Sequence, residues 1–307
     1  MKIVYMGTPD FAIKPLELLL DNGFDVVGVV TMPDKPAGRG HRIQFSAVKQ
    51  FALERNLKIL QPTSLKNENF IAELKSLKAE IQVVVAFRML PEIVWNMPKM
   101  GTVNMHSSLL PQYRGAAPIN WAIINGETQT GVTTFLLQHE IDTGNIIFQQ
   151  NIDIEPNDNA GTLHDKLGKL GAELLVKTIK AIKSGNYKTI PQPKAENIKL
   201  APKIFKDICK LDFSKNCMEL HNLVRGLSPT PAAWFEYKKG QIVEIVKVYE
   251  TKPEVATHNF ENGQLLTDGK KYIKIAVNDG FLQIEILQLA GKKRMSAQDL
   301  LRGYRFD

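Results

Sequence analysis

The chain has 307 residues, of which 44% are hydrophobic and 23% are charged. This composition is ordinary for a globular protein and excludes extended disorder, collagen-like repeats and coiled coil. No apolar run approaches the roughly 18 residues of a membrane span, and two cysteines are too few for a disulfide framework or a zinc finger. We therefore expect a cytoplasmic protein with reduced thiols, no membrane partner and no metal.

The net charge of +7 is not spread evenly along the chain. Residues 1–182 hold 18 basic and 18 acidic residues, residues 183–203 hold 5 and 1, and residues 204–307 hold 16 and 13. An excess of cations serves either solubility or a surface that meets a polyanion such as nucleic acid. Charge alone leaves both interpretations open.

The first part of the chain predicts strands that alternate with helices. The strands are expected at residues 2–6, 26–31, 58–60, 81–86 and 103–105, and the helices at 11–20, 47–55, 67–77 and 91–95. A last long helix follows Thr162, whose hydroxyl and Asp165 resemble a capping box. Strand, helix and strand within about 30 residues favour right-handed crossovers. The sequence therefore predicts an α/β domain with a Rossmann-like parallel sheet.

A change of composition at residues 184–203, where prolines stand among lysines, is typical of a linker. Short strands are predicted beyond it, at residues 243–249, 272–276 and 281–289. A small, OB-like β-barrel is the closure we expect for them. The predicted division is an α/β domain over residues 1–184, a basic proline-containing linker over 185–203 and a β-barrel domain over 204–307.

The end of the strand at 103–105 is the first candidate for chemistry. Asn104 and His106 alternate there with apolar residues, and open parallel sheets bind ligands at the carboxyl ends of their strands. Strand alternation places both residues on one face, so that an amide and an imidazole can converge on one atom. Read alone, the pair also fits two ordinary hydrogen-bonded polar residues. A dinucleotide fingerprint, a P-loop and a nucleophile elbow are all absent from the sequence.

Several motifs together resemble the folate-dependent formyltransferases. They are Asn104, His106, the run Ser108-Leu109-Leu110-Pro111 and the loop Asp142-Thr143-Gly144. Within that family, the chain is most similar to the branch that acts on methionyl-tRNA, because further matching segments stand at residues 7–11, 33–40, 290–293 and 295–300. One segment departs from the pattern: Arg88-Met89-Leu90 stands where many members have Tyr-Gly, and it resembles the Arg-x-Leu segment with which glycinamide-ribonucleotide formyltransferases hold the pterin through backbone groups.

The resemblance implies transfer of a formyl group from 10-formyltetrahydrofolate to the amino group of methionyl-initiator tRNA, a step that supports translation initiation. It implies that Asn104 and His106 bind the oxyanion that develops during transfer. Asp142 would orient the imidazole and help to relay a proton. Without the other two residues, Asp142 would be interpreted as a turn residue.

The resemblance also implies two sets of binding residues. Folate would contact Arg88, Met89, Leu90, Ser108, Leu109, Leu110 and Pro111, and tRNA would contact Lys35, Arg39, Arg42, Lys292 and Lys293. Taken by itself, the basic loop at residues 33–45 fits a solvated loop equally well, and the run at 108–111 fits loop packing. We expect the protein to be a monomer.

Two other functions stay open from the sequence. A formyltransferase for an amino sugar nucleotide or for glycinamide ribonucleotide would share the Asn, His and Asp set, but the basic loop and the C-terminal domain count against it. A non-catalytic RNA-binding protein with a decayed enzyme fold would explain the cations. The presence of Asn104, His106 and Asp142 together counts against that alternative.

Overall fold

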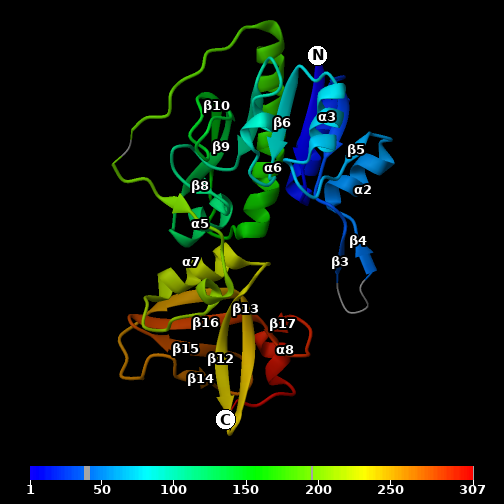
Figure 1. Cartoon of the computed structure of the whole chain (residues 1–307). Coiled ribbons are helices and arrows are strands. Elements are labelled where there is room, and N and C mark those ends of the chain that lie inside the picture. The colour runs from blue at the N-terminus through cyan, green and yellow to red at the C-terminus, as the bar shows by residue number, and fades with distance from the viewer. Residues whose placement is uncertain (38–41, 195, 307) are drawn as a thin grey trace. The chain divides into compact units, whose positions relative to one another are not determined.

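The computed structural model describes residues 1–37, 42–194 and 196–306 (Figure 1). The chain forms two compact units that interleave along the sequence. Unit 1 comprises residues 1–115, 130–152 and 164–200, and unit 2 comprises residues 116–129, 153–163 and 201–307. No helix in the described part of the chain is both long and apolar enough to cross a bilayer. The contiguous boundaries at residues 184 and 203 stay a prediction.

A seven-stranded sheet forms the centre of unit 1. Its strands are β1 (Lys2–Gly7), β2 (Asp25–Val30), β5 (Ile59–Leu60), β6 (Ile81–Val85), β7 (Thr102–His106), β9 (Gln129–Leu136) and β10 (Ile146–Asp153), in the order β10-β9-β7-β6-β1-β2-β5. The strands from β7 to β5 are parallel to their neighbours, whereas β9 runs antiparallel to β7. The predicted α/β class is confirmed, and β9 and β10 were missed by the sequence reasoning.

Helices cover both faces of this sheet. They are α1 (Ile13–Asp21), preceded by a 3-10 turn at Asp10–Ala12, α2 (Ala47–Glu54), α3 (Glu68–Ser76), α4 (Glu92–Trp95) and α6 (Ala160–Ser184). Phe70 of α3 and Val94 of α4 pack with Val84 of β6 on one face. Met105 follows Asn104, the residue paired with Val84, so its side chain points to the other face. There its sulfur would lie only 2.7 Å from a Cβ placed on Gly171 of α6.

The cap of the long helix α6 differs from the expected one. Asn159 and Thr162 form the capping pair, because each backbone N–H donates to the side-chain oxygen of the other at 3.0 Å. The helix therefore begins at Ala160, two residues before Thr162. The prediction of a Thr162–Asp165 box was wrong, and Asp165 instead lies 3.1 Å from Nδ1 of His164. Asn is the stronger N-cap residue, since its side-chain oxygen reaches the N3 N–H readily.

Unit 2 is built on an antiparallel sheet. Its strands are β12 (Ala233–Lys239), β13 (Ile242–Val255), β14 (Leu265–Thr267), β15 (Ile273–Val277), β16 (Gly280–Leu289) and β17 (Met295–Ser296), in the order β12-β13-β16-β15-β14 with β17 beside β16. Register shifts near Glu250 interrupt the ladder of the long strand β13, and such bulges bend a sheet. The small β domain expected from the sequence is confirmed as an antiparallel half-barrel.

Three helices complete unit 2, namely α5 (Pro118–Ile124), α7 (Cys217–Leu227) and α8 (Ala297–Leu301), with a 3-10 turn at Lys206–Cys209. Helix α7 packs on the sheet through Leu220, Val224 and Leu227, and both cysteines are buried in this core as free thiols. The remaining short strands of the chain are β3 (Lys35–Ala37), β4 (Arg42–Gln44), β8 (Arg114–Gly115) and β11 (Leu200–Ala201).

Arg225 of α7 explains why residues 153–163 belong to unit 2. Its Nη1 donates to the carbonyl oxygens of Pro156 at 3.1 Å and Asp158 at 2.8 Å, and its Nη2 donates to Asn222 Oδ1 at 2.7 Å. In the same way, the Asn120 amide of α5 donates to the carbonyl oxygen of Gly226 at 2.7 Å. Hydrogen bonds between residues about 70 to 100 positions apart thus attach residues 153–163 and helix α5 to the rest of unit 2.

His221 of α7 makes the stability of the chain sensitive to pH. Burial, with a smaller contribution from nearby Arg225, lowers the pKa of His221 from 6.5 to about 4. Its Nδ1 lies 3.0 Å from Thr251 Oγ1. The folded state therefore holds this imidazole neutral, and the unfolded state binds its proton more readily. The stabilisation is complete above about pH 6.5 and is lost as the pH falls toward 4.

We expect the free energy of unfolding of His221→Asn, which keeps an acceptor for Thr251, to depend less on pH between 6.5 and 4 than that of the wild type. The difference in slope should approach about 1.4 kcal/mol per pH unit, which corresponds to one proton. Urea unfolding at several pH values measures it. His139→Asn is the control, because that imidazole is 76% exposed. Equal slopes for His221→Asn and the wild type would contradict the assignment.

Candidate active site

The carboxyl ends of β6 and β7 carry an unusual concentration of backbone strain. Ala86, Tyr113 and Asp142 all adopt positive φ angles, of 46°, 60° and 55°. A non-glycine residue in this region costs on the order of 1 to 3 kcal/mol and persists only where its surroundings hold it, which is common at functional sites. Ala86 directly follows β6, Tyr113 lies in the loop between β7 and β8, and Asp142 lies in the loop between β9 and β10. Strain therefore points to this edge of the sheet as the site.

Asn104 lies near the end of β7, paired in register with Val84 of β6 and Phe135 of β9. Its side chain is half-buried. Within the described ranges, no protein group hydrogen-bonds its amide. Most polar side chains that leave water make hydrogen bonds, so an unpartnered amide at a strand end is available to a ligand.

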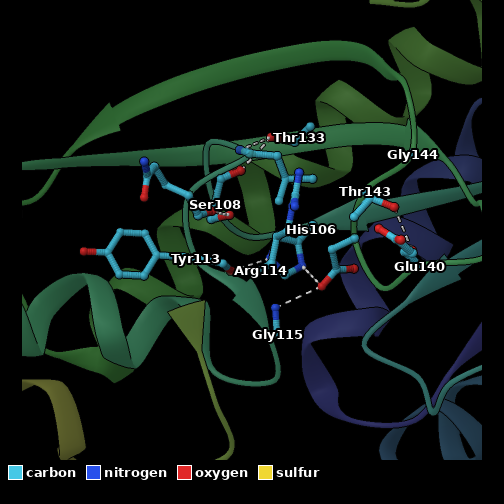
Figure 2. A network of polar contacts seen from close by, with 12 residues as sticks. His106, Ser108, Tyr113, Arg114, Gly115, Thr133, Glu140, Thr143 and Gly144 are labelled. Carbon is cyan, nitrogen blue, oxygen red and sulfur yellow. Dashed lines mark hydrogen bonds and ion pairs between the residues drawn. The ribbon is translucent and has the colours of Figure 1, made fainter. Parts of the chain in front are cut away.

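His106 is buried between two oxygen atoms (Figure 2). Its Nε2 lies 2.8 Å from the carbonyl oxygen of Tyr113, and its Nδ1 lies 3.9 Å from Asp142 Oδ2. A carbonyl only accepts, so this bond assigns a proton to Nε2. Nδ1 is then the basic nitrogen, and it faces a carboxylate at a distance just beyond hydrogen bonding.

Asp142 is brought to His106 by the loop between β9 and β10. Its side chain is 10% exposed, and Oδ2 accepts the backbone N–H of Gly115 at 3.0 Å (Figure 2). Nearby, the Thr143 hydroxyl donates to the carbonyl oxygen of Glu140 at 3.1 Å. The structure thus joins Asp142 to His106, and strand alternation puts Asn104 on the face of His106. Their catalytic roles stay predictions.

The run Ser108–Pro111 is held by two residues that the sequence reasoning missed as site residues. The Thr133 hydroxyl donates to the Ser108 carbonyl oxygen at 2.7 Å and accepts the Leu110 N–H at 3.1 Å. The Gln149 amide donates to the Leu110 carbonyl oxygen at 2.9 Å. Ser108 and Leu110 are buried and Leu109 is half-buried. Several backbone groups of this run are therefore already bonded within the protein, and the proposed folate contact relies more on its apolar wall.

The Arg88 side chain is directed to the segment after β5. Its Nη1 donates to the carbonyl oxygen of Thr63 at 3.0 Å and its Nη2 to that of Pro62 at 2.5 Å. Burial lowers the pKa of this guanidinium. The backbone of residues 88–90 thus remains the part that could meet a ligand, with Met89 largely exposed and Leu90 buried.

The predicted tRNA residues fall in both units. Lys35 is exposed on β3 and Arg42 begins β4, whereas Arg39 lies outside the described residues. Asp34 at the base of this hairpin binds Lys49 Nζ at 2.5 Å and the Gln61 amide at 2.8 Å. In unit 2, the exposed Lys292 and Lys293 lie between β16 and β17, and Lys292 Nζ stands 5.2 Å from the Tyr304 ring centroid.

Among residues 1–37, 42–194 and 196–306, no three or more His, Cys, Asp or Glu side chains are grouped so that they could hold a metal ion.

Two family models match the chain. The formyl transferase model matches residues 1–179, and the formyl transferase C-terminal domain model matches residues 203–305. A methionyl-tRNA formyltransferase of Bacteroides fragilis is 53% identical over 309 residues, covering 99% of this chain and 95% of the relative. One from Flavobacterium johnsoniae is 54% identical over 306 residues, covering 100% and 97%.

Solved structures resemble the chain as well. WlaRD, a sugar 3N-formyl transferase crystallised with dTDP and 5-N-formyl-THF, has a TM-score of 0.66 at 26% identity, covering 95% of this chain and 99% of its own. HypX from Aquifex aeolicus in complex with tetrahydrofolic acid has a TM-score of 0.64 at 18% identity, covering 100% of this chain and 48% of its own. The second likeness concerns the fold alone.

Proposed function

The chain belongs to the formyl transferase family, and we propose on that premise that it transfers the formyl group of 10-formyltetrahydrofolate to the amino group of methionyl-initiator tRNA. The observation that carries the proposal is the identity of 53% and 54% to methionyl-tRNA formyltransferases over nearly the full length of both chains. The likeness includes unit 2 as well as the unit that holds Asn104, His106 and Asp142. We further propose a monomeric, cytoplasmic enzyme.

The residues at the end of β7 fit a formyl donor. The Asn104 amide has no hydrogen-bond partner within the described ranges, so it can bind a formyl oxygen without breaking a bond in the protein. In the run that follows β7, Leu110 packs with Phe135 and Ile146, so the surroundings of this run are apolar, which suits the flat face of a pterin ring. When bound, the folate supplies the formyl carbon that the methionyl amino nitrogen attacks, and its N10 leaves.

Asn104 supplies the electrostatic part of the mechanism. Negative charge develops on the formyl oxygen as the new carbon–nitrogen bond forms. An amide N–H directed at that oxygen stabilises the charge, and one such donor is typically worth about 10²- to 10³-fold in rate. The partial burial of Asn104 strengthens the interaction, because water competes with it less.

His106 and Asp142 supply the proton transfer. With a proton on Nε2 bound to Tyr113, the His106 Nδ1 can take the proton that leaves the attacking nitrogen and return it to the leaving nitrogen. The Asp142 carboxylate, 3.9 Å from Nδ1, stabilises the imidazolium that forms. Relative to the expectation from the sequence, this geometry favours Asn104 as the oxyanion donor and His106 as the proton carrier.

A formylation assay tests the proposal. Purified full-length protein is given 10-formyltetrahydrofolate with either methionyl-initiator tRNA or an amino sugar nucleotide, and formyl product is quantified for each. We expect formyl-methionyl-tRNA as the main product. Formylation of the amino sugar alone would replace the proposal with the activity named for WlaRD. The absence of both products from folded protein would refute formyl transfer.

Substitution of Arg39 should distinguish a tRNA substrate from a small-molecule substrate. We expect Arg39→Ala to reduce kcat/KM for methionyl-tRNA by a factor that corresponds to about 1 to 3 kcal/mol of lost transition-state binding, the range for a charge-assisted contact. Folate affinity should stay unchanged. Steady-state kinetics beside a folate titration measure both effects. Arg55→Ala is the control, since its guanidinium is 43% exposed and pairs with Glu17. Unchanged tRNA kinetics would refute the contact.

A further inference from the structure

The segment predicted as a linker is in part bound to the loop that carries Asp142. Ile190 pairs with Ile146 at the start of β10 through two backbone hydrogen bonds of 2.8 Å, one in each direction. Two residues later, the half-buried Gln192 reaches the same loop. Residues 190–192 are therefore a structural part of unit 1, although the composition of the surrounding stretch at 184–203, with prolines among lysines, is typical of a free linker.

The Gln192 amide has a partner at each polar position. Its Nε2 donates to the carbonyl oxygens of Asp142 at 2.7 Å and Gly144 at 2.9 Å. Its Oε1 accepts Nε and Nη2 of Arg114 at 3.1 and 2.5 Å. The amide orientation is determined, because a flipped amide would set its oxygen against two carbonyls and its NH2 group against a guanidinium.

The hydrogen bonds from Gln192 restrain the backbone of Asp142. Asp142 has a φ of 55°, a conformation that an Asp leaves unless its surroundings hold it. Gln192 holds its backbone carbonyl, and the Gly115 N–H holds its carboxylate at 3.0 Å. The backbone restraint and the carboxylate restraint together determine where Oδ2 lies relative to His106 Nδ1.

We propose that Gln192 is a positioning residue for formyl transfer, which acts by keeping Asp142 in the conformation that directs its carboxylate to His106. Arg114 takes part in the same arrangement, because its guanidinium donates to Oε1 of Gln192. The inference rests on the proposed function, in which Asp142 stabilises the imidazolium. It assigns a role in turnover to a residue 50 positions beyond Asp142, in a segment that composition alone treats as a spacer.

Gln192→Glu tests the proposal in the full-length protein. A carboxylate still accepts from Arg114, but it has no N–H to donate to Asp142 and Gly144. We expect kcat to fall roughly 10- to 100-fold, as for a catalytic group displaced by about 1 Å, and KM for folate and for methionyl-tRNA to change less than about twofold. Gln150→Glu is the matched control, because Gln150 is an exposed glutamine of β10 in the same unit.

The same substitution in an Asp142→Asn background separates positioning from general stability. If Gln192 acts through Asp142, Gln192→Glu lowers kcat in the wild type but adds nothing in the Asp142→Asn protein, because coupled residues are not additive. An equal loss in both backgrounds, or an unchanged kcat in the wild type, would overturn the proposal. Full activity of Asp142→Asn alone would instead refute the role of Asp142 in the proposed function.

A second variant protects the test against misfolding. Gln192→Met keeps the length of the side chain and removes the donors without adding a charge. If Gln192→Glu does not give folded protein, judged by its urea unfolding midpoint, Gln192→Met is measured in both backgrounds. The same loss of kcat in the wild-type background, with none in the Asp142→Asn background, supports the proposal, and any other pattern overturns it.

Discussion

Asn104→Ala is expected to lower kcat for formyl transfer by about 10²- to 10³-fold and to leave the unfolding midpoint near that of the wild type. The amide binds the formyl oxygen most strongly when that oxygen carries the charge of the transition state, so its loss slows the reaction much more than it weakens the ground-state complex. Stability should be kept, because within the described ranges no protein group loses a hydrogen bond when the amide is removed. Single-turnover kinetics, a folate titration and urea unfolding measure the three quantities.

The control for this prediction is Asn69→Ala, which removes an exposed amide from α3. It should change neither rate nor stability. Retention of full activity by Asn104→Ala would remove the oxyanion role. A loss of folate affinity as large as the loss of kcat would make Asn104 a binding residue that does not discriminate between ground and transition states.

Gly144→Ala should affect stability and activity together. A Cβ at this position would lie 1.7 Å from the Leu136 carbonyl oxygen and 2.9 Å from the Leu136 carbonyl carbon. Both atoms are backbone, so the loop must separate from β9. We expect about 3 kcal/mol of lost stability, at the upper end for overpacking. Formyl transfer should fall in the protein that remains folded, because the displaced loop carries Asp142.

Urea unfolding and kcat on the folded fraction test this expectation. Gly303→Ala is the control, since a Cβ there meets no atom within 4 Å. An unchanged unfolding midpoint for Gly144→Ala would show that the loop accommodates a side chain. It would then follow that Asp142 is held less tightly than its contacts with Gln192 and Gly115 indicate.

The sequence by itself determined the elements whose pattern is local. The apolar runs of β1, β2 and β6 and the helical periodicity of α2 and α3 were predicted within one or two residues of their observed bounds. Strand alternation likewise put Asn104 and His106 on one face of β7. Burial of a strand or of one helix face depends on residues a few positions apart, which a local pattern contains.

The strands beside β7 show where a local pattern fails. The strand β9 includes Thr133 and Thr134, both fully buried, and a hydroxyl in a strand core needs a hydrogen-bond partner that the local sequence does not show. They are tolerated because Thr134 Oγ1 lies 2.8 Å from Thr178 Oγ1 of α6, and Thr133 binds Ser108. These partners are 44 and 25 residues away, so no reading of β9 alone could have supplied them.

The tertiary structure alone decided how the site is supported and how the chain is divided. Gln192 joins Asp142 over 50 residues, and Arg225 joins Asp158 over 67 residues. The first contact makes part of an apparent linker a support of the site, and the second moves residues 153–163 into unit 2. A buried polar group needs a hydrogen-bond partner, and the topology determines which distant residue supplies it. The motifs could therefore predict candidate residues for the site, whereas the groups that hold these residues depend on which distant segments the completed fold brings together.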